Sequence, residues 1–143
     1  MTSKEKILNS IRKNNVVENV ELPNSYENFG LTFEDKFEKF STMIESVGGK
    51  ALLIDKADLE KTISELYPDE KIIASNVEGF SLKNFDANEK DDAHELKDID
   101  LAVVKGNFAI AENGAVWMKN EDNRHRALYF IAQNIVTVLD EKD

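Results

Sequence analysis

The sequence has no cysteine, and only two prolines and six glycines among its 143 residues. Without a thiolate, this chain cannot itself hold a disulfide, a cysteine-ligated zinc ion or a cysteine-ligated iron–sulfur cluster. A continuous apolar run of about 18 residues is also missing, so we expect no membrane span. The first residues lead into no apolar core of the signal-peptide kind, which favours a cytoplasmic location.

Basic residues are few relative to acidic ones. Eighteen lysines and arginines against 28 aspartates and glutamates give a net charge of −10. This balance argues against sequence-independent binding of nucleic-acid phosphates or anionic lipid. The hydrophobic fraction of 41% and the charged fraction of 32% are typical of a globular protein with a real core. We expect an N-terminal helix and linker over residues 1–30 and one α/β domain over residues 31–143.

Four short apolar segments have the length and composition of buried strands. They span residues 51–54, 71–74, 101–104 and 135–139. Apolar residues at helical spacing between these segments predict helices, and Gly48-Gly49 and Pro68 mark two helix ends. Helices that alternate with strands imply right-handed crossovers and a largely parallel sheet covered by helices. The expected central residues of the strands are Leu52, Ile73, Val103 and Val136.

An aromatic stripe precedes the first of these strands. Its members follow helical spacing after a capping-box-like segment at residues 32–35. The stripe could form a ligand-stacking surface, but a core face packed on the sheet is the commoner use of such residues. The predicted core face consists of Phe33, Phe37, Phe40 and Ile44.

Residues 106–119 predict a β-hairpin. Asn113-Gly114 lies between two apolar runs, and Asn-Gly readily takes the two positive-φ conformations of a type I′ turn. Glu112 and Ala115 then flank the turn. Glu112 is thereby a carboxylate at the end of a rigid hairpin, a position that suits either a purely structural turn or a functional site.

No metal site is predicted. Residues 86–100 carry seven acidic side chains against two lysines, yet the oxygen-ligand spacing and central glycine of a calcium loop are missing. We expect a solvated, partly helical surface segment there. His94 lies inside this segment without a second histidine at helical spacing, and we interpret it as a surface residue.

Residues 99–139 resemble the lactate-utilisation protein C family, also called the LUD domain. The family pattern of a buried strand, glycine, a polar residue, an aromatic residue and Ala-Ile-Ala-Glu is matched by residues 106–114, Gly-Asn-Phe-Ala-Ile-Ala-Glu-Asn-Gly. Arg126 and residues 127–139 match the arginine, turn and strand that follow in the family. Asn113 and Ala115 depart from the family's hydroxyl residues, and Ala132-Gln133 replaces a Pro-Pro. The family's later Ser-Gly-Pro-Ser-type loop has no counterpart, so the resemblance implies a C-terminally incomplete domain.

The resemblance implies the fold of the ribose-phosphate isomerase and CoA-transferase superfamily. It also implies a function: an accessory, non-redox subunit of an iron–sulfur system that oxidises L-lactate to pyruvate. The clusters would then belong to iron–sulfur partner proteins, and this chain would carry no cofactor of its own.

Two other functions stay open, as does the question of whether the chain is an enzyme. Ala-Glu-Asn-Gly resembles the Ser-Glu-Asn-Gly motif of CoA-transferases, in which the glutamate forms an acyl intermediate, so Glu112 is a catalytic candidate. The chain could instead bind a small carboxylate without turnover, because the planar guanidinium groups of Arg124 and Arg126 suit that ligand. The candidate ligand-binding residues are Gly106, Asn107, Glu112, Asn113, Gly114 and Arg126.

Overall fold

A computed structural model describes residues 2–15, 31–119, 121 and 123–142. The chain forms two units, Met1–Leu31 and Thr32–Asp143. Most of the linker expected before residue 31 lies outside the described residues. Within the described residues, no helix is long and apolar enough to cross a bilayer.

The first unit contains helix α1, Ser3–Asn14. Thr2 is its N-cap. The Thr2 hydroxyl accepts a hydrogen bond from the Glu5 amide at 3.2 Å, and the Glu5 carboxylate accepts one from the Thr2 amide at 2.7 Å. This capping box satisfies two of the amides that a helix start leaves unpaired.

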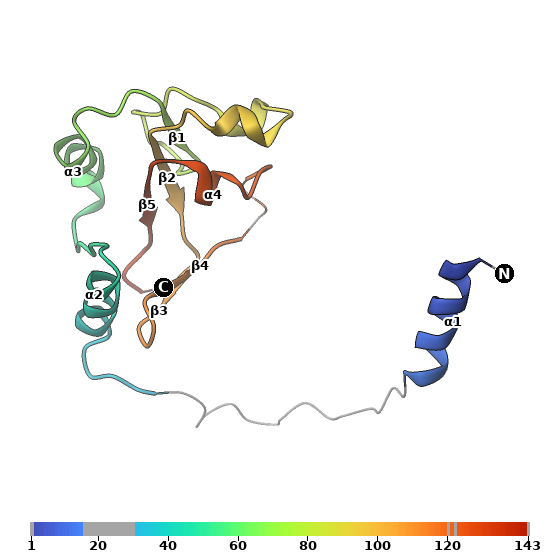
Figure 1. Cartoon of the computed structure of the whole chain (residues 1–143). Helices are drawn as coiled ribbons and strands as arrows, with labels where there is room; N and C mark the ends of the chain where they lie inside the picture. The colour runs from blue at the N-terminus through green and yellow to red at the C-terminus, as the bar shows by residue number, and fades with distance from the viewer. Residues whose placement is uncertain (1, 16–30, 120, 122, 143) are drawn as a thin grey trace. The chain divides into compact units, whose positions relative to one another are not determined.

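The centre of the second unit is a three-stranded parallel sheet (Figure 1). Its strands are β1 (Ile73–Ser75), β2 (Leu101–Lys105) and β5 (Asn134–Val138), in the order β1-β2-β5. Ala102 pairs with Ala74 on one side and with Ile135 on the other. The strands predicted at 101–104 and 135–139 are confirmed within one residue at each end, and the one predicted at 71–74 starts two residues later and ends one residue later.

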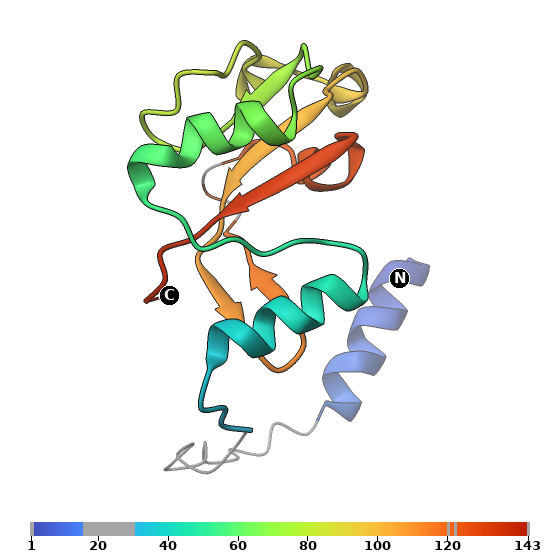
Figure 2. The same ribbon diagram turned by 90° about the vertical axis from the view of Figure 1, so that its left-hand side faces the viewer.

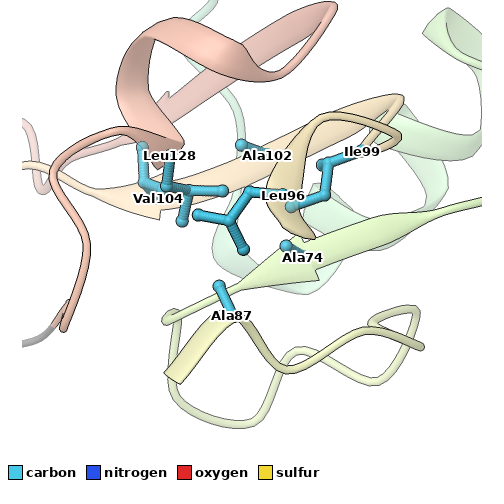
Figure 3. Close-up of a cluster of buried hydrophobic side chains, with 7 residues drawn as sticks. All are labelled: Ala74, Ala87, Leu96, Ile99, Ala102, Val104 and Leu128. Atoms are coloured by element: carbon cyan, nitrogen blue, oxygen red, sulfur yellow. The ribbon is translucent and has the colours of Figure 1, made fainter. Parts of the chain in front are cut away.

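Each face of the sheet carries its own apolar cluster. On one face, side chains from β1 and β2 pack with Leu96 of helix η3 (Ala93–Leu96) and Leu128 of helix α4 (Leu128–Ile131), as Figure 3 shows. On the other face, Leu101 and Val103 pack with Ile63 of helix α3 (Leu59–Leu66). Because β2 is covered on both faces, its first four residues are completely buried. The unit also contains two short helices, η1 (Lys56–Asp58) and η2 (Ala87–Glu89).

The strand predicted at residues 51–54 is wrong. These residues form no strand, and the side chains of Leu52, Leu53 and Ile54 are 44%, 59% and 40% exposed. The outer edge of β1 is already occupied, because the main chain of Phe85 forms a parallel bridge with Ala74 there. The run therefore cannot pair at the outer edge of β1, and it forms the irregular segment that precedes η1.

The predicted packing of the aromatic stripe on the sheet is also wrong. Helix α2, Lys36–Ser46, has no buried residue, and Phe37 is 39% exposed. The turn of the hairpin packs against this helix instead (Figure 2): a Cβ on Gly114 would lie 3.1 Å from Cβ of Met43. The predicted helix end is confirmed, since Gly48 follows the helix with φ +84°.

Candidate functional site

The predicted hairpin consists of β3 (Phe108–Ile110) and β4 (Ala115–Trp117). The predicted type I′ turn is wrong, because no described residue other than glycine has a positive φ. A four-residue loop joins the strands, and only Gly114, at its end, has a positive φ, of +71°. The Gly114 amide donates to the Ile110 carbonyl oxygen at 3.0 Å, and Asn113 Oδ1 accepts from the Ala115 amide at 3.0 Å. Asn113 therefore acts through its side chain, in an Asx turn, without a left-handed backbone.

Gly106 and Asn107 join the sheet to the hairpin. The Gly106 amide donates to the Val138 carbonyl oxygen at 2.9 Å. A Cβ on Gly106 would lie 2.6 Å from Cδ2 of Leu139 and 2.7 Å from Cγ1 of Val116, so only glycine fits without a shift. Asn107 Oδ1 accepts from the Lys119 amide at 2.7 Å. Both predicted ligand residues thus have structural contacts that account for their identity.

Glu112 is exposed in the hairpin loop. Among the described residues, no side chain or main-chain group makes a hydrogen bond or ion pair with its carboxylate. A carboxylate nucleophile is usually oriented by neighbouring groups. The structure provides none for Glu112 within the described part of the chain.

Arg126 lies apart from this loop, in a shallow concavity. The concavity is bounded by β4, the residues that follow it, α4 and β5. Its polar and charged lining consists of Lys119, Glu121, Arg126, Tyr129 and Thr137, and its apolar lining consists of Val116, Trp117, Met118, Phe130 and Ile135. The structure therefore brings one predicted ligand residue, Arg126, into the concavity, and Glu112, Asn113 and Gly114 do not line it.

The sequence analysis missed Lys119 and Tyr129 as lining residues. The Tyr129 hydroxyl accepts from Asn123 Nδ2 at 2.8 Å and is 3.4 Å from the Lys119 carbonyl oxygen, which fixes the ring beside the concavity. Lys119 is the last residue of the predicted hairpin, and Tyr129 lies in the segment that follows Arg126. Nothing in the sequence indicates that either side chain lines a concavity.

The three residues from Arg124 to Arg126 have different partners. Arg124 Nη2 lies 2.7 Å from Asp91 Oδ1, so this guanidinium pairs with a surface carboxylate. His125 Nε2 lies 2.9 Å from the Lys90 carbonyl oxygen. Arg126 makes no side-chain hydrogen bond or ion pair with any described residue. Its guanidinium is thus available to an anion in the concavity.

Carboxyl groups with lowered pKa values lie outside the concavity. The amides of Ile72 and Lys71, at 2.8 Å and 3.0 Å, donate to Asp100 and hold its pKa below the usual range. Hydrogen bonds from the amide and hydroxyl of Ser81 lower the pKa of Glu60 in the same way. In both cases the hydrogen bonds join two segments that are distant in the sequence.

In the described ranges, no cluster of three or more histidine, aspartate or glutamate side chains is arranged to hold a metal ion.

One face of the hairpin is apolar and exposed. Phe108, Ile110 and Trp117 lie on this face and are 42%, 37% and 57% exposed. The rings of Phe108 and Trp117 are stacked, with centroids 5.9 Å apart and an interplanar angle of 6°. Exposed apolar patches of this kind mark interaction surfaces.

No protein-family model, curated protein or solved structure matches the chain.

Proposed function

We propose that this chain is a non-redox accessory subunit of an iron–sulfur L-lactate oxidation system. The resemblance to the LUD family supports this proposal. The resembling residues 99–139 fold into adjoining elements of one unit: β2, the hairpin, α4 and β5. Oxidation of lactate to pyruvate releases two electrons, and a chain without cysteine has no thiolate ligands for a cluster that would accept them. The clusters are therefore assigned to partner proteins.

The observation that carries the proposal is the exposed aromatic face of the hairpin. An accessory subunit needs a surface on which a partner can dock. Interface cores are enriched in tryptophan, phenylalanine and other large apolar residues, and a few aromatic side chains supply most of the binding energy. Phe108 and Trp117 present such a pair on the segment that carries the family motif.

Reconstitution tests the accessory role. The cluster-bearing lactate-utilisation proteins, assayed for lactate-dependent reduction of an artificial electron acceptor, should turn over only when this chain is added. Trp117→Lys should abolish the stimulation, because it removes one ring of the stacked pair and places a charge on the aromatic face. Leu66→Lys is the matched control, since Leu66 is a 45% exposed apolar residue on α3.

Three results would contradict this proposal. They are lactate oxidation by the isolated chain, turnover by the cluster proteins without it, and equal stimulation by Trp117→Lys and the unchanged protein.

A second candidate function is binding of a small carboxylate, and the position of Arg126 favours it. Arg126 and Lys119 are two cations in one concavity of an acidic chain, accompanied by one acidic residue, Glu121. A guanidinium binds a carboxylate through two parallel hydrogen bonds. Calorimetry with lactate and pyruvate should detect binding that Arg126→Gln removes. Arg124→Gln is the matched control, because Arg124 pairs with Asp91 instead.

Acyl transfer through Glu112 has no comparable support and stays a prediction. An acyl exchange with CoA that disappears in Glu112→Gln would favour it over both functions proposed above.

A further inference from the structure

The two outer edges of the sheet differ in how their main-chain groups are used. In a parallel strand, successive residues direct their main-chain groups alternately to one neighbour and to the other. The Asn134 amide donates to the Asp100 carbonyl oxygen at 2.9 Å, and the Val138 carbonyl oxygen accepts from Gly106 at 2.9 Å. Residues 134, 136 and 138 therefore face β2. Ile135 and Thr137 consequently direct their N–H and C=O groups away from β2.

The outward groups of β5 have no partner in the part of the chain that the structure describes. No hydrogen bond there involves the amides or carbonyls of Ile135 and Thr137 outside the β2–β5 ladder. The outer edge of β1 is closed by contrast. The Ile73 carbonyl oxygen accepts from the amides of Asn84 and Phe85 at 3.0 Å and 3.1 Å, and the Ile73 amide donates to Asn84 Oδ1 at 2.9 Å.

The open edge also lacks the usual protection against strand pairing. Natural edge strands carry lysine, proline or bulges that prevent another strand from adding. β5 has the sequence Asn-Ile-Val-Thr-Val, without a charge or a proline. It is mostly β-branched, and Ile135 on it is 45% exposed. Nearby Phe130 is 86% exposed and lines the same concavity as Ile135.

We propose that β5 pairs with β5 of a second copy of this chain. The pairing is antiparallel about a two-fold axis at Val136, which joins the two sheets into one continuous sheet. In this register, Ile135 lies opposite Thr137 of the second copy, and Thr137 lies opposite Ile135 of the second copy. Each of these pairs exchanges both main-chain hydrogen bonds, as hydrogen-bonded antiparallel pairs do. The arrangement is self-complementary, as a two-fold interface requires.

Charge complementarity beside β5 supports a second copy as the occupant. β5 itself is uncharged, so no like charges face each other within the paired strands. The acidic residues Asp140 and Glu141 follow β5 directly. In the antiparallel register, they run past residue 132 of the second copy, which directly follows α4. The unpaired cation Arg126 lies in the concavity on that side of the sheet.

Sedimentation velocity over a concentration series from about 5 to 200 µM tests the pairing. The unchanged chain should approach twice the 16.2 kDa mass of one copy. Thr137→Pro should weaken dimerisation at least about tenfold, since proline removes an outward N–H and is tolerated at an edge that faces away from its neighbour. Thr137→Val keeps the main chain and the shape of the side chain, and should dimerise like the unchanged protein.

Ile135→Lys gives a second, independent variant that keeps every main-chain group. It places two like charges near the two-fold axis and should also weaken dimerisation at least about tenfold. Circular dichroism shows that each variant is folded. A mass of one copy for the unchanged chain at the highest concentration overturns the proposal. Dimers of unchanged affinity in both folded variants overturn it as well.

Discussion

The outer edges of β1 and β5 belong to one small sheet, yet one is closed and the other is open. At β1, the Asn84 side chain bonds the main chain before and at Ile73: its amide oxygen accepts from the Ile73 amide, and its side-chain nitrogen donates to the Lys71 carbonyl oxygen at 2.6 Å. At β5, no described segment supplies such groups. The main chain of Asn84 and Phe85 and the Asn84 side chain together close this edge, which the sequence of β1 alone would leave open.

The largest expected effect on stability is in β2, the central strand between the two edges. Leu101→Ala should lower the free energy of unfolding by about 2–5 kcal/mol, because a fully buried leucine leaves a cavity. Ile135→Ala on the open edge should cost about 1 kcal/mol or less, since Ile135 is 45% exposed. Urea denaturation, followed at a concentration below dimerisation, measures both. Equal costs at the two positions would contradict the assignment of centre and edge.

Gly106→Ala tests the junction between the sheet and the hairpin. The added methyl group would meet Leu139 and the stiff side chain of Val116 at less than 3 Å. We expect a loss of stability of about 1–3 kcal/mol, as overpacking typically gives. Gly79→Ala is the comparison, because a Cβ there meets no atom within 4 Å and only the positive φ of 76° opposes it. A neutral Gly106→Ala would show that the junction is looser than described.

Asn84→Ala should open the closed edge in part, because the main-chain bonds of residues 84 and 85 to Ile73 remain. The change removes two hydrogen bonds at β1, and we expect a loss of about 1 kcal/mol, because Asn84 is exposed and water replaces part of what is lost. Lys83→Ala, at the neighbouring exposed position, controls for changes in the loop. If Asn84→Ala also increases self-association, an open edge is sufficient to recruit a second copy.

The smallest effect concerns pH. The pKa of Asp100 is lowered by hydrogen bonds from the amides of Ile72 and Lys71, which precede β1. The ionised carboxylate is therefore the form that the folded state favours. Its contribution to stability is present above the ordinary aspartate pKa and is lost as the pH falls through the lowered value. Urea denaturation from pH 7 down to pH 3 should show a smaller acid-induced loss in Asp100→Asn than in the unchanged chain.

The sequence predicted the elements whose residues determine them locally. The run at Leu101 to Val104 is apolar throughout because both faces of β2 are covered. The hairpin was placed correctly, but its turn type was not, since Asn113 contributes an Asx turn in a longer loop. The failures at residues 51–54 and at the aromatic stripe have a common cause. Both runs are apolar, and what an apolar run packs on is decided by tertiary contacts, such as the bridge at Phe85 and the approach of Gly114 to Met43.

The candidate site was less accessible to sequence reasoning than the fold. Glu112 and Arg126 belong to one family-like segment, but they lie in different environments, because Gly114 turns the hairpin loop onto α2 while Arg126 precedes α4. The short distance between Glu112 and Arg126 in the sequence gave no indication that they lie in different environments. The lining residues Lys119 and Tyr129 come from irregular segments or a short helix and follow no periodic pattern.

Residue-resolved amide hydrogen exchange tests the contrast between the edges most directly. The Ile73 amide, bonded to Asn84 Oδ1, should be protected at every protein concentration. The Thr137 amide should exchange rapidly in dilute protein and become protected as the concentration rises, because a second copy then accepts its hydrogen bond. Protection of the Thr137 amide that is independent of concentration would contradict this account. So would a lack of protection at every concentration, because the open edge of β5 is expected to pair with β5 of a second copy.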